Sequence, residues 1–130
     1  MTRGSTHRPA AGALWALVVL ALAGCEPNGE GALTASVEGP LTGAVVVEVT
    51  GTGVLGFEDA GDVRTFSGAV DPRATTHRVI AVSASGQRIR FRVRVEELEA
   101  PPPRATVVAA SDLDDAPIES LGGYSVRIAR

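Results

Sequence analysis

The chain has 130 residues, of which 45% are hydrophobic and only 4% aromatic, and its formal net charge at pH 7 is −3. This length suits one domain with one core. All twelve basic residues are arginine and acids outnumber them, which is untypical of a nucleic-acid surface, so we expect no nucleic-acid partner.

Residues 1–24 have the order of a secretory signal. Arg3 and Arg8 precede an unbroken apolar stretch from Ala10 to Leu22, and no acidic residue comes before it. As a helix this stretch would rise about 20 Å, which is less than the ~30 Å hydrocarbon core of a bilayer. The pattern predicts a signal peptide that is cleaved rather than a helix that spans the membrane.

The sequence Leu22-Ala23-Gly24-Cys25 ends this segment. Small residues directly before a cysteine at this position resemble the lipobox of bacterial lipoproteins. The resemblance implies cleavage between Gly24 and Cys25, a diacylglyceryl group on the Cys25 thiol, and a further acyl chain such as palmitate on the new amino group. Two or three acyl chains give lasting attachment. The expected location is therefore the cell envelope, held to a membrane by lipid.

Glu26 rather than Asp follows the cysteine, which by the same resemblance favours the outer membrane if the cell has two membranes. The alternatives are an ordinary secretory signal with an incidental Cys25, or a membrane anchor rich in small residues. Cys25 is the single cysteine of the chain. With its thiol lipidated, we expect no disulfide, no cysteine nucleophile and no cysteine metal ligand in the domain.

Residues 25–31 are polar and rich in turn formers, which predicts a flexible tether. Period-two patterns between turn residues then continue through residues 32–130. The predicted strands are 33–38, 44–50, 54–58, 63–70, 77–83, 88–96, 105–110 and 124–129. About seven to eight short strands at this spacing predict an all-β fold, an antiparallel β-sandwich of the immunoglobulin-like or cohesin-like kind.

Three of these strands carry further information. Residues 44–49 are apolar on nearly both faces, which predicts a central strand. The C-terminal pattern of Tyr124, Val126 and Ile128 predicts a strand that closes a sheet. From residue 88 to 95 apolar residues alternate with four arginines, which we call the Arg row: Arg88, Arg90, Arg92 and Arg94. Aromatic residues are few, so the core is expected to consist mainly of aliphatic side chains. These would pack around four aromatic residues, Phe57, Phe66, Phe91 and Tyr124.

The C-terminal fifty residues also resemble cohesin-like sandwiches, which are bacterial surface modules that bind dockerins or related partners. The features are Gly86-Gln87, the alternating strand to Val95, a proline-containing connection, residues 105–110, Asp112-Leu113-Asp114-Asp115 and Gly-Tyr-Ser-Val-Arg-Ile at residues 123–128. The resemblance implies a protein-binding module.

The Arg row predicts a positive stripe roughly 20 Å long on one face of a sheet. Such a stripe suits an anionic glycan, lipid head groups or an acidic protein, because arginine binds carboxylates and phosphates in bidentate fashion. The alternative is a solvated face whose charges are balanced by acids on neighbouring strands.

Two acidic turns offer carboxylates that could hold a cation. Asp112, Asp114 and Asp115 have the spacing of some calcium loops but lack the glycine and distal glutamate of an EF-hand, so a simple loop is the main expectation. A second turn contains Glu58, Asp59 and Asp62. No cofactor is expected.

The leading hypothesis is a non-catalytic, lipid-anchored envelope module that binds or assembles with a protein or polysaccharide. One alternative is a small envelope hydrolase that uses His77 with a nearby acid, and another is a purely structural spacer with no ligand. No nucleophile elbow accompanies His77, so a surface or cross-strand histidine is the main expectation for this residue.

Overall fold

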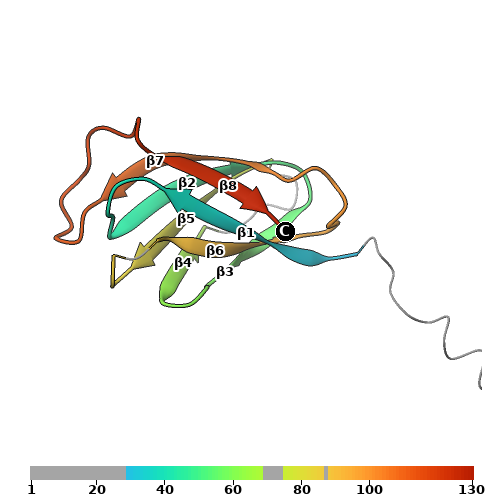
Figure 1. Cartoon of the computed structure of the whole chain (residues 1–130). Coiled ribbons are helices and arrows are strands. Elements are labelled where there is room, and N and C mark those ends of the chain that lie inside the picture. Colours follow the sequence, from blue (N-terminus) through green and yellow to red (C-terminus); the bar gives the residue numbers. More distant parts are fainter. Residues whose placement is uncertain (1–28, 69–74, 87) are drawn as a thin grey trace, which may run out of the picture.

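The computed structural model describes residues 29–68, 75–86 and 88–130 (Figure 1). The predicted signal, the lipobox with Cys25 and most of the predicted tether lie outside these residues. In the described part the chain forms eight strands: β1 (Gly31–Glu38), β2 (Ala44–Thr50), β3 (Val54–Glu58), β4 (Val63–Ser67), β5 (Thr76–Ser83), β6 (Arg90–Val95), β7 (Arg104–Ser111) and β8 (Ser125–Ala129).

The strands form two antiparallel sheets that pack face to face. Sheet A has the order β3-β6-β1-β8, and sheet B has the order β4-β5-β2-β7. The predicted all-β sandwich is confirmed. The predicted central position of residues 44–50 is also confirmed, because β2 pairs with both β5 and β7. The last strand closes sheet A as predicted, since β8 pairs with β1 from Thr34↔Ala129 to Glu38↔Ser125.

Three strand boundaries differ from the predicted ones by two residues or more, and several others differ by one. β1 begins at Gly31 rather than at residue 33, β4 ends at Ser67 rather than at residue 70, and β6 begins at Arg90 rather than at residue 88. The ladder between β1 and β6 ends at Ser36↔Arg90, and the N–H of Val37 makes one more hydrogen bond, to the carbonyl of Ile89 (2.9 Å). Beyond this point the two segments enter separate turns, so Arg88 has no place in the ladder.

The core is built almost entirely from aliphatic side chains of the inner faces. Phe91 is fully buried in β6, and its ring meets the edge of Phe57 with centroids 6.2 Å apart. Phe66 was expected in the core, but it is 60% exposed. The inward orientation of Val63 fixes the parity of β4, so Phe66, three residues later, points to solvent.

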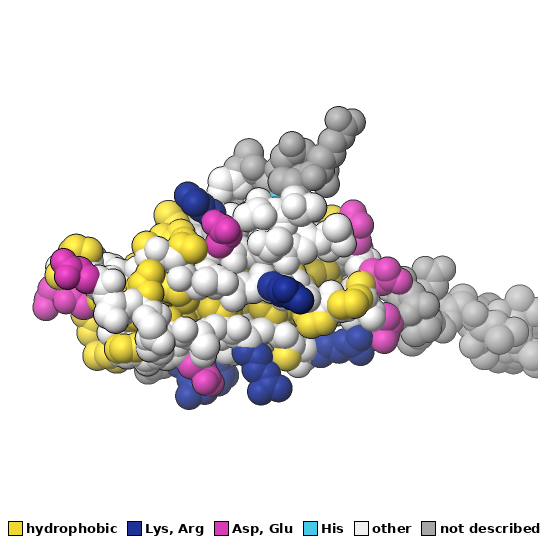
Figure 2. Space-filling view, turned by 90° about the horizontal axis from the view of Figure 1, so that it is seen from above, with side chains coloured by type: hydrophobic (Ala, Val, Ile, Leu, Met, Phe, Trp, Pro, Cys, Tyr) yellow, Lys and Arg dark blue, Asp and Glu magenta, His cyan; other side chains and the backbone are white. Residues whose placement is uncertain are grey.

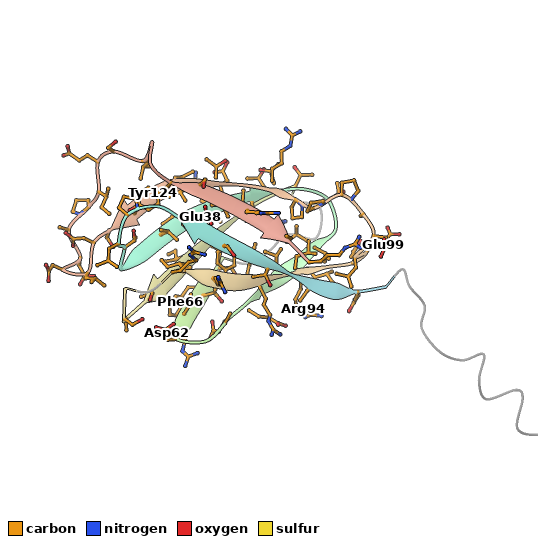
Figure 3. The ribbon with its side chains drawn as sticks, in the orientation of Figure 1. Glu38, Asp62, Phe66, Arg94, Glu99 and Tyr124 are labelled. Carbon is orange, nitrogen blue, oxygen red and sulfur yellow. The ribbon has the colours of Figure 1, made fainter. Side chains whose placement is uncertain are left out.

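The sandwich has two distinct ends. At the end where the described chain begins, the N–H of Leu98 donates to the carbonyl of Gly29 (3.2 Å), and Arg130 pairs with Glu99. Glu38 and Tyr124 lie toward the opposite end, as Figure 3 shows. We call these the entry end and the far end.

Among the described residues, no helix has the length and apolar character needed to cross a membrane.

Candidate functional site

The Arg row occupies the outer face of sheet A, where side chains alternate with the buried residues of β6. Register brings a further arginine to this face. Arg90 lies opposite Ser36 of β1, and Ser36 lies opposite Arg127 of β8. Neighbouring strands are about 4.8 Å apart, so the backbones at Arg90 and Arg127 are only about 10 Å apart. Figure 2 shows arginine side chains gathered along the lower edge of the view, where sheet A faces solvent.

Among the residues that the structure describes, the ion pairs of the Arg row are all at one end. The guanidinium of Arg94 lies 3.5 Å from a carboxylate oxygen of Glu30 and 3.5 Å from one of Glu58. This is the balancing by neighbouring strands that the alternative interpretation predicts, and Glu58 also lies opposite Arg92 in the ladder of β3 and β6. Within the described residues, Arg90, Arg92 and Arg127 have no acid within 4.0 Å.

The other arginines put this observation in context. Arg64 pairs with Asp59 at 3.3 Å and Arg78 with Glu48 at 3.3 Å, both on sheet B. Among the described arginines, those without an ion pair are Arg88, Arg90, Arg92, Arg104 and Arg127. All but Arg104 lie on sheet A or at the start of β6. Unpaired positive charge is therefore concentrated on one face.

We call Arg90, Arg92 and Arg127 the arginine face. Hydroxyl groups lie among them, because Ser36 separates Arg90 from Arg127, and Thr34 lies opposite Arg92. The exposed large hydrophobic side chains of the described residues all lie elsewhere: Leu41, Phe66, Ile80, Val108 and Leu113. The arrangement offers guanidinium and hydroxyl donors on a flat, polar surface, which matches the oxygens of an anionic ligand.

Arg88 borders two hollows at the far end, and Arg90 of the arginine face borders only one of them. One, of about 360 Å³, lies beside the turn between β3 and β4 and is also lined by Asp62 and Arg90. The other, of about 250 Å³, is also lined by Glu38 and Tyr124. The predicted Arg row is therefore divided into a paired arginine at 94, two members of an open face, and Arg88 at the hollows.

The acidic turns use their carboxylates to hold the backbone. Asp112 Oδ1 accepts the N–H groups of Asp114 and Ala116, each at 2.9 Å. Asp115 adopts the left-handed conformation, with φ of 62°. No group of three His, Cys, Asp or Glu side chains converges as metal ligands would in the part of the chain that the structure describes. The geometry is that of a closed acidic loop.

The second acidic turn behaves similarly. The backbone N–H of Thr65 donates to Asp59 Oδ1 (2.7 Å), the Thr65 hydroxyl donates to the same oxygen (2.9 Å), and Arg64 lies beside the other oxygen. These groups hold the pKa of the Asp59 carboxyl below its usual value, with the backbone hydrogen bond as the largest cause. The hydroxyl of Ser85 donates to Asp62.

His77 is a core residue rather than a surface residue, which corrects one of the two expectations for it. It lies opposite Val49 in the ladder of β2 and β5, is 6% exposed, and contacts the ring of Phe57 edge-on with centroids 6.3 Å apart. Its Nε2 atom has no hydrogen-bond partner among the described residues. A histidine buried between the sheets is poorly placed for an acid–base step on an outside substrate.

Comparison with protein-family models, with curated proteins and with solved structures finds no match. The lipobox and cohesin-like resemblances therefore stay predictions.

Sequence reasoning missed Arg127 as a member of the arginine face. The available signal was the alternation of Val126 and Ile128, which implies that residue 127 points outward, but only the register places it beside Arg90.

Proposed function

We propose that the protein is a lipid-anchored module of the cell envelope that binds an acidic polysaccharide through the arginine face, without catalysis. The observation that carries the proposal is the concentration of unpaired arginines on one face of sheet A, whereas the arginines of β4 and β5 are paired with acids. Side chains two residues apart on one strand are about 6.6 to 6.8 Å apart, so successive anionic groups of a polymer can be bound in turn.

A polysaccharide is favoured over a protein partner by the chemistry of this face. Protein interfaces depend on a desolvated centre of aromatic or aliphatic side chains. The arginine face has none of the large exposed hydrophobic residues found in the described part of the chain. Arginines interspersed with the hydroxyls of Thr34 and Ser36 instead suit a hydrated, oxygen-rich ligand.

The lipid anchor is supported by the sequence around Cys25 and is compatible with the fold. The described chain begins at Gly29, four residues after Cys25, at the entry end of the sandwich. An anchored domain would therefore stand close to the membrane on its entry end. The arginine face runs along its side and would stay open to a polymer at the membrane surface.

The hydrolase alternative receives no support from the site geometry. The hollows that border Arg88 lie at the far end, whereas His77 is buried between the sheets beside Phe57. A hydrolytic histidine needs to reach the bond that is cleaved.

Binding of the full chain in mild detergent to polygalacturonate, with neutral dextran as the comparison polymer, tests the proposal. We expect binding to polygalacturonate alone, weakening as salt is raised. The triple variant Arg90→Gln/Arg92→Gln/Arg127→Gln should lose at least about tenfold in affinity. The matched control is Arg64→Gln/Arg78→Gln/Arg104→Gln, which removes the same charge from sheet B. Equal losses in the two variants would show that net charge, and not this face, governs binding.

The anchor has its own test. Mass spectrometry of the mature N-terminus is expected to find Cys25 as the first residue, carrying a diacylglyceryl group. An unmodified Cys25 thiol, or cleavage at another position, would contradict the anchor while leaving the polysaccharide proposal to its own measurement.

A further inference from the structure

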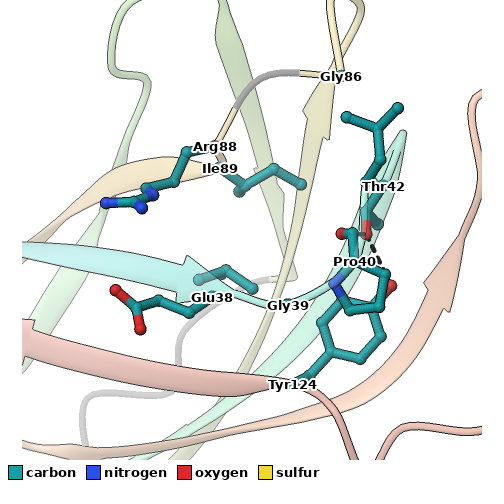
Figure 4. Close-up of a pocket in the computed structure, with 10 residues that line it drawn as sticks. Glu38, Gly39, Pro40, Thr42, Gly86, Arg88, Ile89 and Tyr124 are labelled. Atoms are coloured by element: carbon teal, nitrogen blue, oxygen red, sulfur yellow. Dashed lines mark hydrogen bonds between the residues drawn. The ribbon is translucent and has the colours of Figure 1, made fainter.

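A hollow of about 250 Å³ opens at the far end, between the end of β1 and the segment that leads into β6 (Figure 4). It exists because these two segments separate. Their ladder ends at Ser36↔Arg90, and the hydrogen bond from Val37 to Ile89 is the last link between them. Val37 and Ile89 lie at its base and are both buried, so the hollow has an apolar floor.

The wall of this hollow is held in place by contacts that leave little freedom. The Thr42 hydroxyl donates its one proton to the carbonyl of Pro40 (2.6 Å). In the contact between Tyr124 and Thr42 Oγ1 (2.7 Å) the Tyr124 hydroxyl is therefore the donor. The ring of Tyr124 packs so closely on Gly39 that a Cβ there would lie 2.6 Å from a ring carbon. A pocket with such a fixed wall is formed before a ligand arrives.

Two opposite charges line the hollow without pairing. Glu38 is the last residue of β1 and Arg88 lies two residues before β6, and both line the hollow. Neither side chain makes an ion pair within 4.0 Å in the described part of the chain. In Figure 4 both charged groups lie on one side of the hollow, and the rings of Pro40 and Tyr124 lie on the other.

We propose that this hollow binds a free α-amino acid with an apolar side chain. The guanidinium of Arg88 receives the carboxylate, and the carboxylate of Glu38 receives the ammonium group. The side chain of the ligand packs against Ile89, Pro40 and the Tyr124 ring. The volume is below the ~300–1,000 Å³ of pockets for drug-sized ligands, which suits a ligand of this size. The site is separate from the arginine face, because it uses none of Arg90, Arg92 and Arg127.

Titration of the full chain in mild detergent with L-leucine tests the proposal. Nuclear magnetic resonance should show shifts confined to amides at the hollow, including Gly39 and Thr42, with saturation in the millimolar range or below. Glu38→Gln and Arg88→Gln should each weaken binding about ten- to a hundredfold, because each removes a hydrogen bond between charged groups. Leucine amide, which lacks the carboxylate, and 4-methylpentanoate, which lacks the ammonium group, should bind at least about tenfold more weakly than leucine.

Glu97→Gln and Arg104→Gln are the matched controls, because both residues are exposed and lie outside the hollow. They should bind leucine as the unmodified chain does. Unchanged thermal unfolding of all four variants shows that the fold is intact, as expected for exposed side chains. The proposal is overturned if leucine causes no local shifts, if either singly charged analogue binds as tightly as leucine, or if the hollow variants bind like the controls. Absence of polygalacturonate binding would contradict the proposed function but would not contradict this amino-acid site.

Discussion

The hydroxyl of Tyr124 lies 2.7 Å from Oγ1 of Thr42, although 82 positions separate the two residues in the chain. Thr42 is almost fully buried, and its own hydroxyl proton goes to the carbonyl of Pro40. The contact therefore fastens the connection between β1 and β2 to the start of β8. It adds to the ladder with β1 that holds the C-terminal strand in sheet A.

Replacing Tyr124 with phenylalanine keeps the ring on Gly39 and removes only the donor to Thr42. We expect the free energy of unfolding to fall by about 1 kcal/mol, the usual net value of one hydrogen bond. Urea unfolding of Tyr124→Phe, Thr42→Val and the double variant measures it. If the two single effects simply add, the hydroxyls do not interact and the contact is wrong.

Local pattern was sufficient to predict the strands but not their neighbours. The alternation around Phe91 and Val93, and the apolar run of residues 44–49, indicate strand, face and depth because each signal lies within one element. Pairing of β1 with both β6 and β8 depends on packing between distant segments. The contribution of Arg127 to the arginine face is therefore visible only in the register, and that of Glu38 only in the lining of the hollow.

Two side chains show that residue type is a weaker guide to burial than strand parity. Aromatic scarcity led us to expect Phe66 in the core, yet the inward Val63 leaves it exposed. His77 is expected at the surface or in a cross-strand position, and only the second holds, because His77 is buried opposite Val49. In both cases residue type was weighed more heavily than strand parity, which was readable from the neighbours.

Gly86 is expected to resist substitution more strongly than Gly61, although both have a positive φ, 67° and 61°. A Cβ at Gly86 would lie 2.9 Å from a side-chain carbon of Leu113 and 3.3 Å from one of Leu41, whereas at Gly61 it would meet nothing within 4 Å. Gly61→Ala should cost about 1 kcal/mol of backbone strain. Gly86→Ala should cost slightly more in urea unfolding, because the ends of the exposed Leu113 and Leu41 side chains must move aside. A smaller cost than that of Gly61→Ala would contradict the close packing at residue 86.

Asp59 should make stability depend on pH in the acidic range. Hydrogen bonds from Thr65 lower the pKa of the folded Asp59 carboxyl below its usual value, so the carboxylate stabilises the fold above the unfolded pKa. This contribution is lost as the pH falls through the folded pKa. Asp59→Asn keeps an acceptor for Thr65 but does not titrate. Thermal unfolding measures the difference in stability between this variant and the unmodified chain. The difference should become smaller as the pH is lowered from 5 through the folded pKa of Asp59. A constant difference would contradict the prediction.

Phe91 and Phe66 form a matched pair for the core. Phe91 is fully buried between the sheets, whereas Phe66 is mostly exposed on sheet B. Phe91→Ala should lower the free energy of unfolding by about 3–5 kcal/mol, because it removes buried surface and leaves a cavity. Phe66→Ala should change it by no more than about 0.5 kcal/mol. Similar losses in the two variants would mean that Phe66 is covered, and the assigned parity of β4 would then be wrong.

His77→Leu is expected to stabilise the protein, which is unusual for a core substitution. The Nε2 atom of His77 is buried with no partner among the described residues, and a buried polar atom without a partner costs about 1–3 kcal/mol. Leucine removes that cost and keeps an apolar side chain against Phe57. We expect a rise of about 1 kcal/mol in urea unfolding and unchanged binding of polygalacturonate. A loss of stability would show that the imidazole has an essential partner, and a loss of binding alone would return His77 to the functional site.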